Sequence, residues 1–257
     1  MNFILQEKKD RIGIITLNRP DKRNALNSVV IEELREAFTA IEADEEVKVV
    51  ILRASGTVFS AGADLQYLQQ LQKNSYDENL DDSLRMASLF LQIYNLKKVV
   101  IAEVQGHAIA GGCGLMTVCD YAFVAPEAKF GYTEVSIGFI PAIVLVFLIR
   151  KISEARAKEL LLGGHLIESN RAYDIGLVSK VVAADDLADY VESFAIDLAV
   201  SNSASSMGLT KRLISQVQGM NVEDALNLAA KTNATVRESA DCKRGIAGFL
   251  DGEKISW

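Results

Sequence analysis

The sequence predicts an α/β protein in which strands and helices are unevenly distributed along the chain. Short apolar, β-branched runs such as 49–53 and 99–104 are typical of buried strands, and helical patterns follow them. After residue 185 only helical patterns occur, separated by short polar breaks. These two observations predict a strand-rich core over residues 1–185 and a helical region over residues 186–257.

The N-terminal part of the chain predicts a hairpin followed by a strand and several helices. The apolar segments 3–6 and 12–17 indicate a β-hairpin that turns at Lys9 and Asp10. An amphipathic helix is expected over 28–43, with Ser28 as its N-terminal cap. The strand 49–53 follows, and the remaining pattern predicts helices over 65–72 and 83–95 with a mobile polar segment, 73–82, between them.

In the central part, the strand 99–104 leads through a glycine-rich turn into a helical pattern at 114–124. The run 143–149 is continuously apolar, which predicts a buried helix or the wall of an apolar pocket. Two further helices and a strand are expected over 153–162, 170–175 and 177–182, in that order. The helices of the C-terminal region are expected over 187–199, 205–218, 222–237 and 240–250.

Glycine-rich turns follow two of the predicted strands. The segment 59–65, which contains Gly62, comes after 49–53, and Ala110-Gly111-Gly112 comes after 99–104. Glycine allows bare backbone N–H groups to face a cavity. Two such turns can direct two N–H groups at one point, which is a minimal oxyanion hole for a carbonyl that becomes an enolate.

Glu134 is the candidate acid/base residue. It follows the second glycine turn, and its neighbours Val135, Ile137 and Phe139 are apolar. Burial in such surroundings raises the pKa of a carboxyl group toward general acid/base use. Oxyanion donors together with one carboxylate predict an active site, whereas the alternative interpretation is a solvated glutamate at the end of a strand.

The composition excludes several classes of function. A net charge of −7 leaves no basic stripe for nucleic acid, and no apolar run approaches the roughly 20 residues of a membrane span. The three cysteines, Cys113, Cys119 and Cys242, cannot all pair within the chain and fit no metal-ligand spacing. With no secretory signal in the first residues, these features indicate a cytoplasmic protein in the thiol state.

Several motifs, taken together, resemble the crotonase family, the enoyl-CoA hydratases and isomerases, over essentially the whole chain. They are the segments 18–27, 59–65 and 106–120, Phe130-Gly131 with Glu134, Ala172 with 176–178, and 245–250. The resemblance implies a spiral core of ββα turns followed by an α-helical trimerisation region. It also implies an acyl-CoA substrate and a homotrimer or homohexamer, with no metal and no cofactor because CoA is part of the substrate.

The resemblance assigns roles to individual residues. The N–H groups of Ala63 and Gly111 match the oxyanion hole for the thioester oxygen, and Glu134 matches the glutamate that moves a proton at Cα. The residues that match the segment meeting the CoA nucleotide are Lys22, Arg23 and Ala25. Other contacts with substrate or CoA are implied for Ala61, Asp64, Leu65 and Gly114, and at the CoA site of a neighbouring subunit for Phe249 and Lys254.

Gly114 and the segment 142–147 depart from the pattern of many hydratases in the family. Those enzymes commonly carry a second glutamate at the position of Gly114, which helps to hold the attacking water, and a run of glycines after Pro141. Glycine at 114 is expected to leave space for a branched or carboxylated acyl chain. The residues 133–135 and 138–142 are most similar to the methylglutaconyl-CoA hydratases of bacterial leucine breakdown.

The leading hypothesis is therefore an acyl-CoA lyase of the hydratase type. It would add or remove water across the 2,3 double bond of a short, branched enoyl-CoA, in fatty-acid or branched-chain amino-acid metabolism. The alternative is a Δ3-Δ2 enoyl-CoA isomerase that uses Glu134 alone, since moving a double bond only shuttles a proton between carbons. A non-catalytic acyl-CoA-binding protein is a third hypothesis, and the presence of Glu134 argues against it.

Overall fold

The computed structural model describes residues 3–257, and a six-stranded sheet forms its centre. The strand order is β1-β2-β3-β4-β6-β9. β1 pairs antiparallel with β2, and each later pair of neighbours in this sheet is parallel. The strands are β1 (Ile4–Lys9), β2 (Ile12–Leu17), β3 (Val49–Ala54), β4 (Val99–Val104), β6 (Tyr121–Val124) and β9 (Lys180–Val181).

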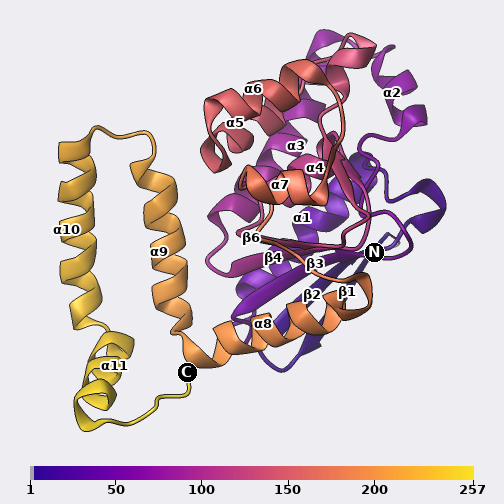
Figure 1. The fold of residues 1–257 in the computed structure, drawn as a ribbon. Coiled ribbons are helices and arrows are strands. Elements are labelled where there is room, and N and C mark those ends of the chain that lie inside the picture. Colours follow the sequence, from indigo (N-terminus) through magenta and orange to yellow (C-terminus); the bar gives the residue numbers. More distant parts are fainter. Residues whose placement is uncertain (1–2) are drawn as a thin grey trace.

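Helices cover both faces of this sheet. Every residue of β2 is buried, and so are the first four of β3, which is why their sequences are continuously apolar rather than alternating. On one face lies α8 (Leu187–Ser201), whose Val191 and Ala195 belong to the same apolar cluster as Ile51 of β3 (Figure 1). The helices on the other face are α1 (Ser28–Ala43), α3 (Tyr76–Asn95) and α4 (Gly111–Thr117).

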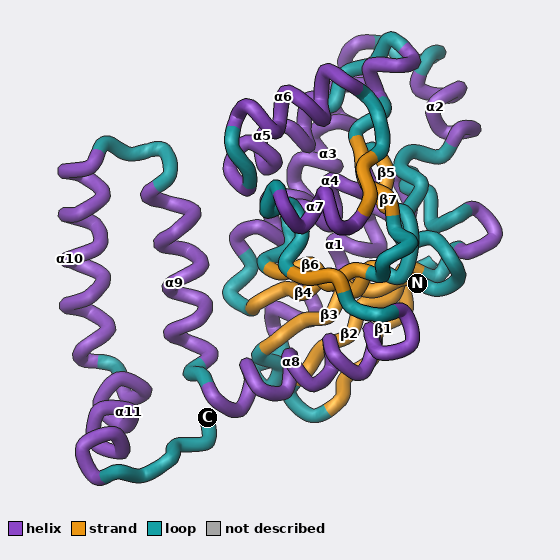
Figure 2. The backbone as a smooth tube through the Cα atoms, in the orientation of Figure 1, coloured by secondary structure: helices purple, strands orange, loops and turns teal. Residues whose placement is uncertain are grey.

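A second, smaller sheet carries the loops of the candidate site. Its strand order is β5-β7-β8, with β5 parallel to β7 and β7 antiparallel to β8. Figure 2 shows β5 and β7 next to each other, outside the main sheet. The strands are β5 (Ala108–Ile109), β7 (Lys129–Gly131) and β8 (Ile167–Glu168).

Three helices form an arm that projects from the core (Figure 1). They are α9 (Ala204–Val217), α10 (Val222–Glu238) and α11 (Ala240–Asp251). α9 is held against the end of α3, because Lys211 Nζ donates a hydrogen bond to Ile93 O at 3.0 Å, whereas α10 has no buried residue. The helical predictions for the C-terminal region are confirmed.

The domain boundary after residue 185 stays a prediction. Of the helices after this residue, α8 packs on the sheet, and α9, α10 and α11 form the arm.

The apolar run 143–149 lies in α5 (Ala142–Lys151), so the prediction of a helix is confirmed. Only one face of α5 is buried, through Val144, Phe147 and Leu148, while Val146 and Ile149 are exposed. The next helices are α6 (Glu154–Gly163) and α7 (Ser169–Asp174), as expected. Among the described residues, no helix is both long enough and apolar enough to cross a bilayer.

Two predictions about helix starts are wrong. α1 is capped by Asn27, whose side chain accepts a hydrogen bond from Val30 N at 3.0 Å, and not by Ser28. The polar segment predicted to be mobile is largely helical, because α3 begins at Tyr76. Ser75 and Glu78 form a capping box there, which satisfies two backbone donors reciprocally.

Two further predictions about the central part are wrong in extent. The helical pattern 114–124 covers two elements, since α4 ends at Thr117 and β6 follows it. β6 joins the sheet between β4 and β9, and tertiary pairing of this kind overrides local helical preference. Of the predicted strand 177–182, only β9 pairs in the sheet, while Leu177 and Val178 are buried without belonging to a strand.

Candidate active site

The two glycine-rich turns lie side by side. Ile109 N donates a hydrogen bond to Ser60 O at 3.0 Å. A Cβ atom on Gly62 would lie 2.9 Å from Ile109 O, and one on Gly112 would lie 2.6 Å from Ser60 O. Both distances are shorter than real Cβ contacts, so only glycine permits this approach. The structure therefore brings together the two turns that the sequence analysis selected.

The amides of Ala63 and Gly111 are available to a ligand. Leu26 forms a bridge with the residues on either side of Ala63: Leu26 N donates to Gly62 O at 2.7 Å, and Asp64 N donates to Leu26 O at 2.9 Å. The N–H group of Ala63 itself takes no part in this bridge. Gly111 is the first residue of α4, and the first N–H groups of a helix have no partner within it. Within residues 3–257 neither N–H donates a hydrogen bond. A Cβ on Gly62 would lie 3.6 Å from Gly111 N, so the two amides belong to adjacent backbone segments.

Ala110 has an unusual backbone conformation directly before Gly111. Its φ is 51° and its ψ is −124°, a combination that residues other than glycine rarely adopt. Strain of this kind costs on the order of 1–3 kcal/mol. It persists because Ala110 N donates to Gly131 O at 2.8 Å while Gly114 N donates to Ala110 O at 3.0 Å. Held in this way, Ala110 fixes the direction of the Gly111 N–H.

Glu134 begins the short 3-10 helix η2 (Glu134–Ile137), shortly after β7. Because β7 pairs with β5, and β5 leads into the Ala110–Gly111 turn, Glu134 follows a strand that is hydrogen-bonded to that turn. Its Oε2 atom is buried and has no hydrogen-bond partner among the described residues. Burial raises the pKa of the Glu134 carboxyl above its ordinary value. A half-buried carboxylate with one buried oxygen that has no partner is suited to proton transfer, and it does not fit the alternative of a solvated glutamate.

The segment predicted to meet the CoA nucleotide borders the first turn. Ala61 N donates a hydrogen bond to Arg23 O at 3.0 Å. Lys22 and Arg23 are exposed, whereas Ala25 is buried. Two cationic side chains therefore lie at the surface beside the first glycine-rich turn, 59–65. Their contact with CoA, like that of Ala25 and Ala61, stays a prediction.

Asn24 was missed by the sequence analysis. It is buried, and its Nδ2 donates to Ser55 O at 2.9 Å and to Val58 O at 2.8 Å. Its φ of 52° lies in the left-handed region that asparagine tolerates better than most residues. Asparagine in a polar turn was a usable signal for such a role. Asn24 ties the segment 22–25 to the first glycine turn.

The carboxylate of Asp64 is engaged within the protein. One oxygen accepts a hydrogen bond from Gln66 N at 2.9 Å and caps α2 (Leu65–Leu71), and the other pairs with Arg19 Nη1 at 2.8 Å. The two paired side chains are only 13% (Arg19) and 8% (Asp64) exposed. Asp64 therefore anchors the first turn, and Arg19 is a second anchor that sequence reasoning missed. The predicted substrate contact of Asp64 stays a prediction, and the side chain of Leu65 lies outside the described residues.

Phe249 and Lys254 lie far along the chain from the turns, in the arm and the segment after it (Figure 1). Phe249 is 84% exposed, and Lys254 is exposed as well. Within one chain, the structure does not bring them to Glu134. Their predicted role at the CoA site of a neighbouring subunit stays a prediction.

The expectation that Gly114 leaves space for an acyl chain is wrong. A Cβ atom at this position would lie 2.3 Å from Val144 Cγ1 and 2.9 Å from Phe90 Cε2. Val144 belongs to α5, so the bulky residues after Pro141 fill the volume that a larger residue at 114 would need. Gly114 is the residue that allows α5 to pack closely against α4.

Gly114→Glu is expected to destabilise the protein. The new side chain would overlap Val144 and place a carboxylate in an apolar wall, so the free energy of unfolding should fall by about 3 kcal/mol or more. Gly114→Glu combined with Val144→Gly removes the overlap with Val144, though not the close contact with Phe90, and should recover part of that loss. Chemical denaturation of the wild type and both variants provides the measurement. A Gly114→Glu variant as stable as the wild type would contradict the packing described above.

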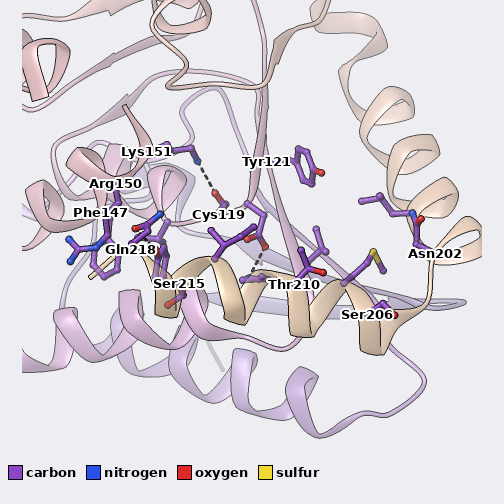
Figure 3. A pocket seen from close by; sticks show the side chains of 18 of the residues that line it. Cys119, Tyr121, Phe147, Arg150, Lys151, Asn202, Ser206, Thr210, Ser215 and Gln218 are labelled. Carbon is purple, nitrogen blue, oxygen red and sulfur yellow. Dashed lines mark hydrogen bonds and ion pairs between the residues drawn. The ribbon is translucent and has the colours of Figure 1, made fainter. Parts of the chain in front are cut away.

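A cavity of about 820 Å³ lies at the end of α4 opposite Gly111, between α5, α8 and α9 (Figure 3). Lys151 Nζ donates to Cys119 O at 2.8 Å, and Lys211 Nζ pairs with Asp120 Oδ2 at 2.7 Å, so both lysines are engaged within the protein. Glu134 does not line this cavity, and neither do Ala63 and Gly111. It is therefore separate from the candidate active site.

Comparisons with known proteins give one consistent result. The sequence profile of the enoyl-CoA hydratase/isomerase family matches residues 7–257. A Thermus thermophilus protein, provisionally named an enoyl-CoA hydratase, is 39% identical over 248 residues, covering 96% of this chain and 98% of that protein. The crotonyl-CoA hydratase of Syntrophomonas wolfei is 32% identical over 256 residues, covering 99% and 97%. The crystal structure of an enoyl-CoA hydratase from Shewanella pealeana matches with a TM-score of 0.94 and 27% identity, covering 99% of this chain and 96% of that chain.

Proposed function

Because this chain belongs to the enoyl-CoA hydratase/isomerase family and has its crotonase-like fold, we propose that it hydrates the 2,3 double bond of a short enoyl-CoA. The observation that carries this proposal is a pair of unused amides, at Ala63 and Gly111, on adjacent backbone segments, of which the Gly111 segment is hydrogen-bonded through Ala110 to the strand before Glu134. Relatives named crotonyl-CoA hydratase and short-chain-enoyl-CoA hydratase support a short acyl chain.

In the proposed reaction, the amides of Ala63 and Gly111 donate hydrogen bonds to the thioester oxygen. Water forms a C–O bond at Cβ while the π electrons move toward that oxygen, and each amide stabilises the resulting enolate by about 2.7–4 kcal/mol. Glu134 accepts a proton from the water and returns one to Cα, which contributes a factor of about 10²–10⁴. One water is added and no electrons leave the substrate, so the proposed step needs no cofactor besides the CoA of the substrate.

Hydration is expected to decline in acid. Glu134 accepts the proton in its ionised form, and burial raises its pKa above the ordinary value of 4.5. The value of kcat/KM should therefore fall as the pH falls through this raised pKa, since kcat/KM reports groups of the free enzyme. A pH profile of kcat/KM for a 2-enoyl-CoA measures the effect. A profile that stays flat through the ordinary glutamate range would contradict a role for ionised Glu134.

We further propose that the acyl chain is branched, as in methylglutaconyl-CoA. The support is the sequence pattern 133–135 with 138–142, whose Phe139 and Ile140 present exposed apolar side chains just after Glu134. Space beside Gly114 gives no support, since Val144 fills it. Values of kcat/KM for a panel of straight and branched 2-enoyl-CoA thioesters test this proposal, and a preference for straight chains would reject it.

Isomerisation of a 3-enoyl-CoA is the second candidate function. The observation that favours it is the close contact of Gly114 with Val144, which leaves no room for a second carboxylate at position 114. The two reactions differ in absorbance. Loss of the conjugated-thioester absorbance of a 2-enoyl-CoA indicates hydration, whereas turnover of a 3-enoyl-CoA with no loss of that absorbance from a 2-enoyl-CoA indicates isomerisation.

CoA recognition is proposed to involve the surface beside the first turn. Lys22 and Arg23 are exposed there and can pair with phosphate. The backbone around Ala25 is proposed to face the adenine, and Ala61 is proposed as a further contact with CoA. The three cysteines are unpaired, which supports a site of action in the reducing cytoplasm.

The arm is proposed to form the contact between subunits of a homotrimer or homohexamer. Its large apolar side chains are exposed on an element that packs little against its own core; they include Val222, Leu226, Ile246, Phe249 and Leu250. Exposed apolar area of this kind marks a protein interface. Light scattering at micromolar concentration should return three or six times the chain mass of 28.0 kDa. A stable monomer would contradict the proposed assembly.

A further inference from the structure

A buried pair of hydroxyl groups links α4, which begins with Gly111, to the segment that carries Glu134. Tyr132 lies between β7 and Glu134, and its hydroxyl oxygen is 2.7 Å from Thr117 Oγ1 in the last turn of α4. Tyr132 is 0% exposed and Thr117 is 4% exposed. The reaction does not use either hydroxyl, and burial of two polar groups in an apolar core requires a reason.

The direction of this hydrogen bond follows from the number of available protons. Thr117 Oγ1 donates its single proton to Cys113 O at 2.8 Å. Tyr132 must therefore donate to Thr117 Oγ1. Burial raises the pKa of Tyr132 well above its ordinary value, so the phenol keeps the proton that it donates.

Thr117 is itself a firmly held partner. Its carbonyl accepts a hydrogen bond from Lys151 Nζ at 3.0 Å, and the same amine donates to Cys119 O at 2.8 Å. The end of α4 is therefore anchored to α5. At the other end of α4, Ala110 N donates to Gly131 O, directly before Tyr132. Hydrogen bonds at both ends of α4 thus join this helix to the residues that precede Glu134.

We propose that Tyr132 is a positioning residue, whose hydroxyl acts through Thr117 to hold Glu134 in register with the Gly111 amide. This inference rests on the proposed function, since it concerns the same carboxylate and the same oxyanion donor. Glu134 Oε2 has no hydrogen-bond partner of its own among the described residues, so its position depends on the backbone that carries it. Catalytic groups lose rate steeply when they are displaced by even an ångström.

The test is a double-mutant cycle on steady-state kinetics. Tyr132→Phe removes only the hydroxyl, and we expect kcat to fall about 10-fold to 100-fold with KM changed by less than about twofold. Thr117→Val should cause a similar fall. The double variant should be no slower than the slower single variant, because both changes remove one shared interaction. Thr117→Ser retains the acceptor oxygen and should restore kcat to within about twofold of the wild type.

Ser169→Ala serves as the matched control. Ser169 is a buried hydroxyl that donates to Ala125 O and Ala128 O, so its loss destabilises the core without touching the link between α4 and Glu134. Its kcat should stay at the wild-type value while its melting temperature falls. The inference would be overturned by wild-type kcat in Tyr132→Phe, by a reduced kcat in Ser169→Ala that matches that of Tyr132→Phe, or by additive effects of Tyr132→Phe and Thr117→Val.

Failure of the proposed function would be recognised separately. A wild-type protein that hydrates no enoyl-CoA but isomerises a 3-enoyl-CoA would reject the hydratase proposal. The same double-mutant cycle is then measured with isomerisation as the reaction, which also depends on Glu134 and on an oxyanion hole. A fall in kcat in both single variants that is not additive in the double variant would support the positioning role of Tyr132 in that reaction. Unchanged kcat in Tyr132→Phe would overturn it.

Discussion

Glu134→Gln is expected to abolish hydration while leaving the affinity for CoA thioesters nearly intact. Glutamine keeps the shape and the polarity of the side chain but cannot accept and return a proton. The proposed oxyanion donors are backbone groups of Ala63 and Gly111, which the substitution does not touch. The expected loss in kcat is about 10²-fold to 10⁴-fold, the usual size of an acid/base effect. Steady-state kinetics measures kcat, and calorimetric titration with a product CoA ester measures the affinity.

Glu103→Gln is the matched control for this variant. Glu103 lies on β4 and is also a half-buried glutamate whose pKa is raised by burial, but it has Arg53 as its charged neighbour and takes no part in the candidate site. Its kcat should equal that of the wild type. If Glu134→Gln retained more than about a tenth of the wild-type kcat, Glu134 would lose its acid/base role.

Gly62→Ala is expected to cause the second-largest loss of activity. The added methyl group would lie 2.9 Å from Ile109 O and 3.0 Å from Ala110 Cβ, so the two turns must move apart. The amides of Ala63 and Gly111 then no longer face the same oxygen atom. We expect kcat to fall about 10²-fold or more, comparable with the loss of one oxyanion donor. The kinetics of the purified variant provide the measurement.

Gly176→Ala separates this effect from backbone strain. Gly62 and Gly176 both have positive φ, 86° and 78°, but a Cβ on Gly176 would meet nothing within 4 Å. Both variants should lose about 1–2 kcal/mol of stability from the left-handed backbone. Only Gly62→Ala should lose activity. Equal kcat values in the two variants would show that the spacing of the turns does not matter for catalysis.

The sequence was sufficient for elements whose signal is local. β2, β3 and β4 are largely apolar, with the runs 49–52 and 99–102 apolar throughout, because both faces of the sheet are covered, and this pattern is readable without a structure. The glycine turns were also readable, since close approach of the backbone requires glycine at Gly62 and Gly112. By contrast, β6 was assigned to a helix, because its place in the sheet depends on β4 and β9 rather than on its own residues.

The parts of the site that depend on distant partners could not be predicted. The role of Asn24 lies in hydrogen bonds to Ser55 and Val58, more than 30 positions away. The surroundings of Gly114 are set by Val144 on another helix, so a glycine that suggested open space is in fact tightly packed. Local sequence identifies which residues can do chemistry, but the packing that restricts them is a property of the fold.

The most direct test of the account is the mass of the product that the wild type forms from a 2-enoyl-CoA in water enriched in oxygen-18. Hydration should yield a 3-hydroxyacyl-CoA that is heavier than the substrate by one water and carries the heavy oxygen. The same product is expected from Glu103→Gln at the wild-type rate, and from Glu134→Gln at a rate at least about 10²-fold lower. An unchanged substrate mass in the wild type, together with conversion of a 3-enoyl-CoA into an isomer of equal mass, would contradict hydration as the function of this protein.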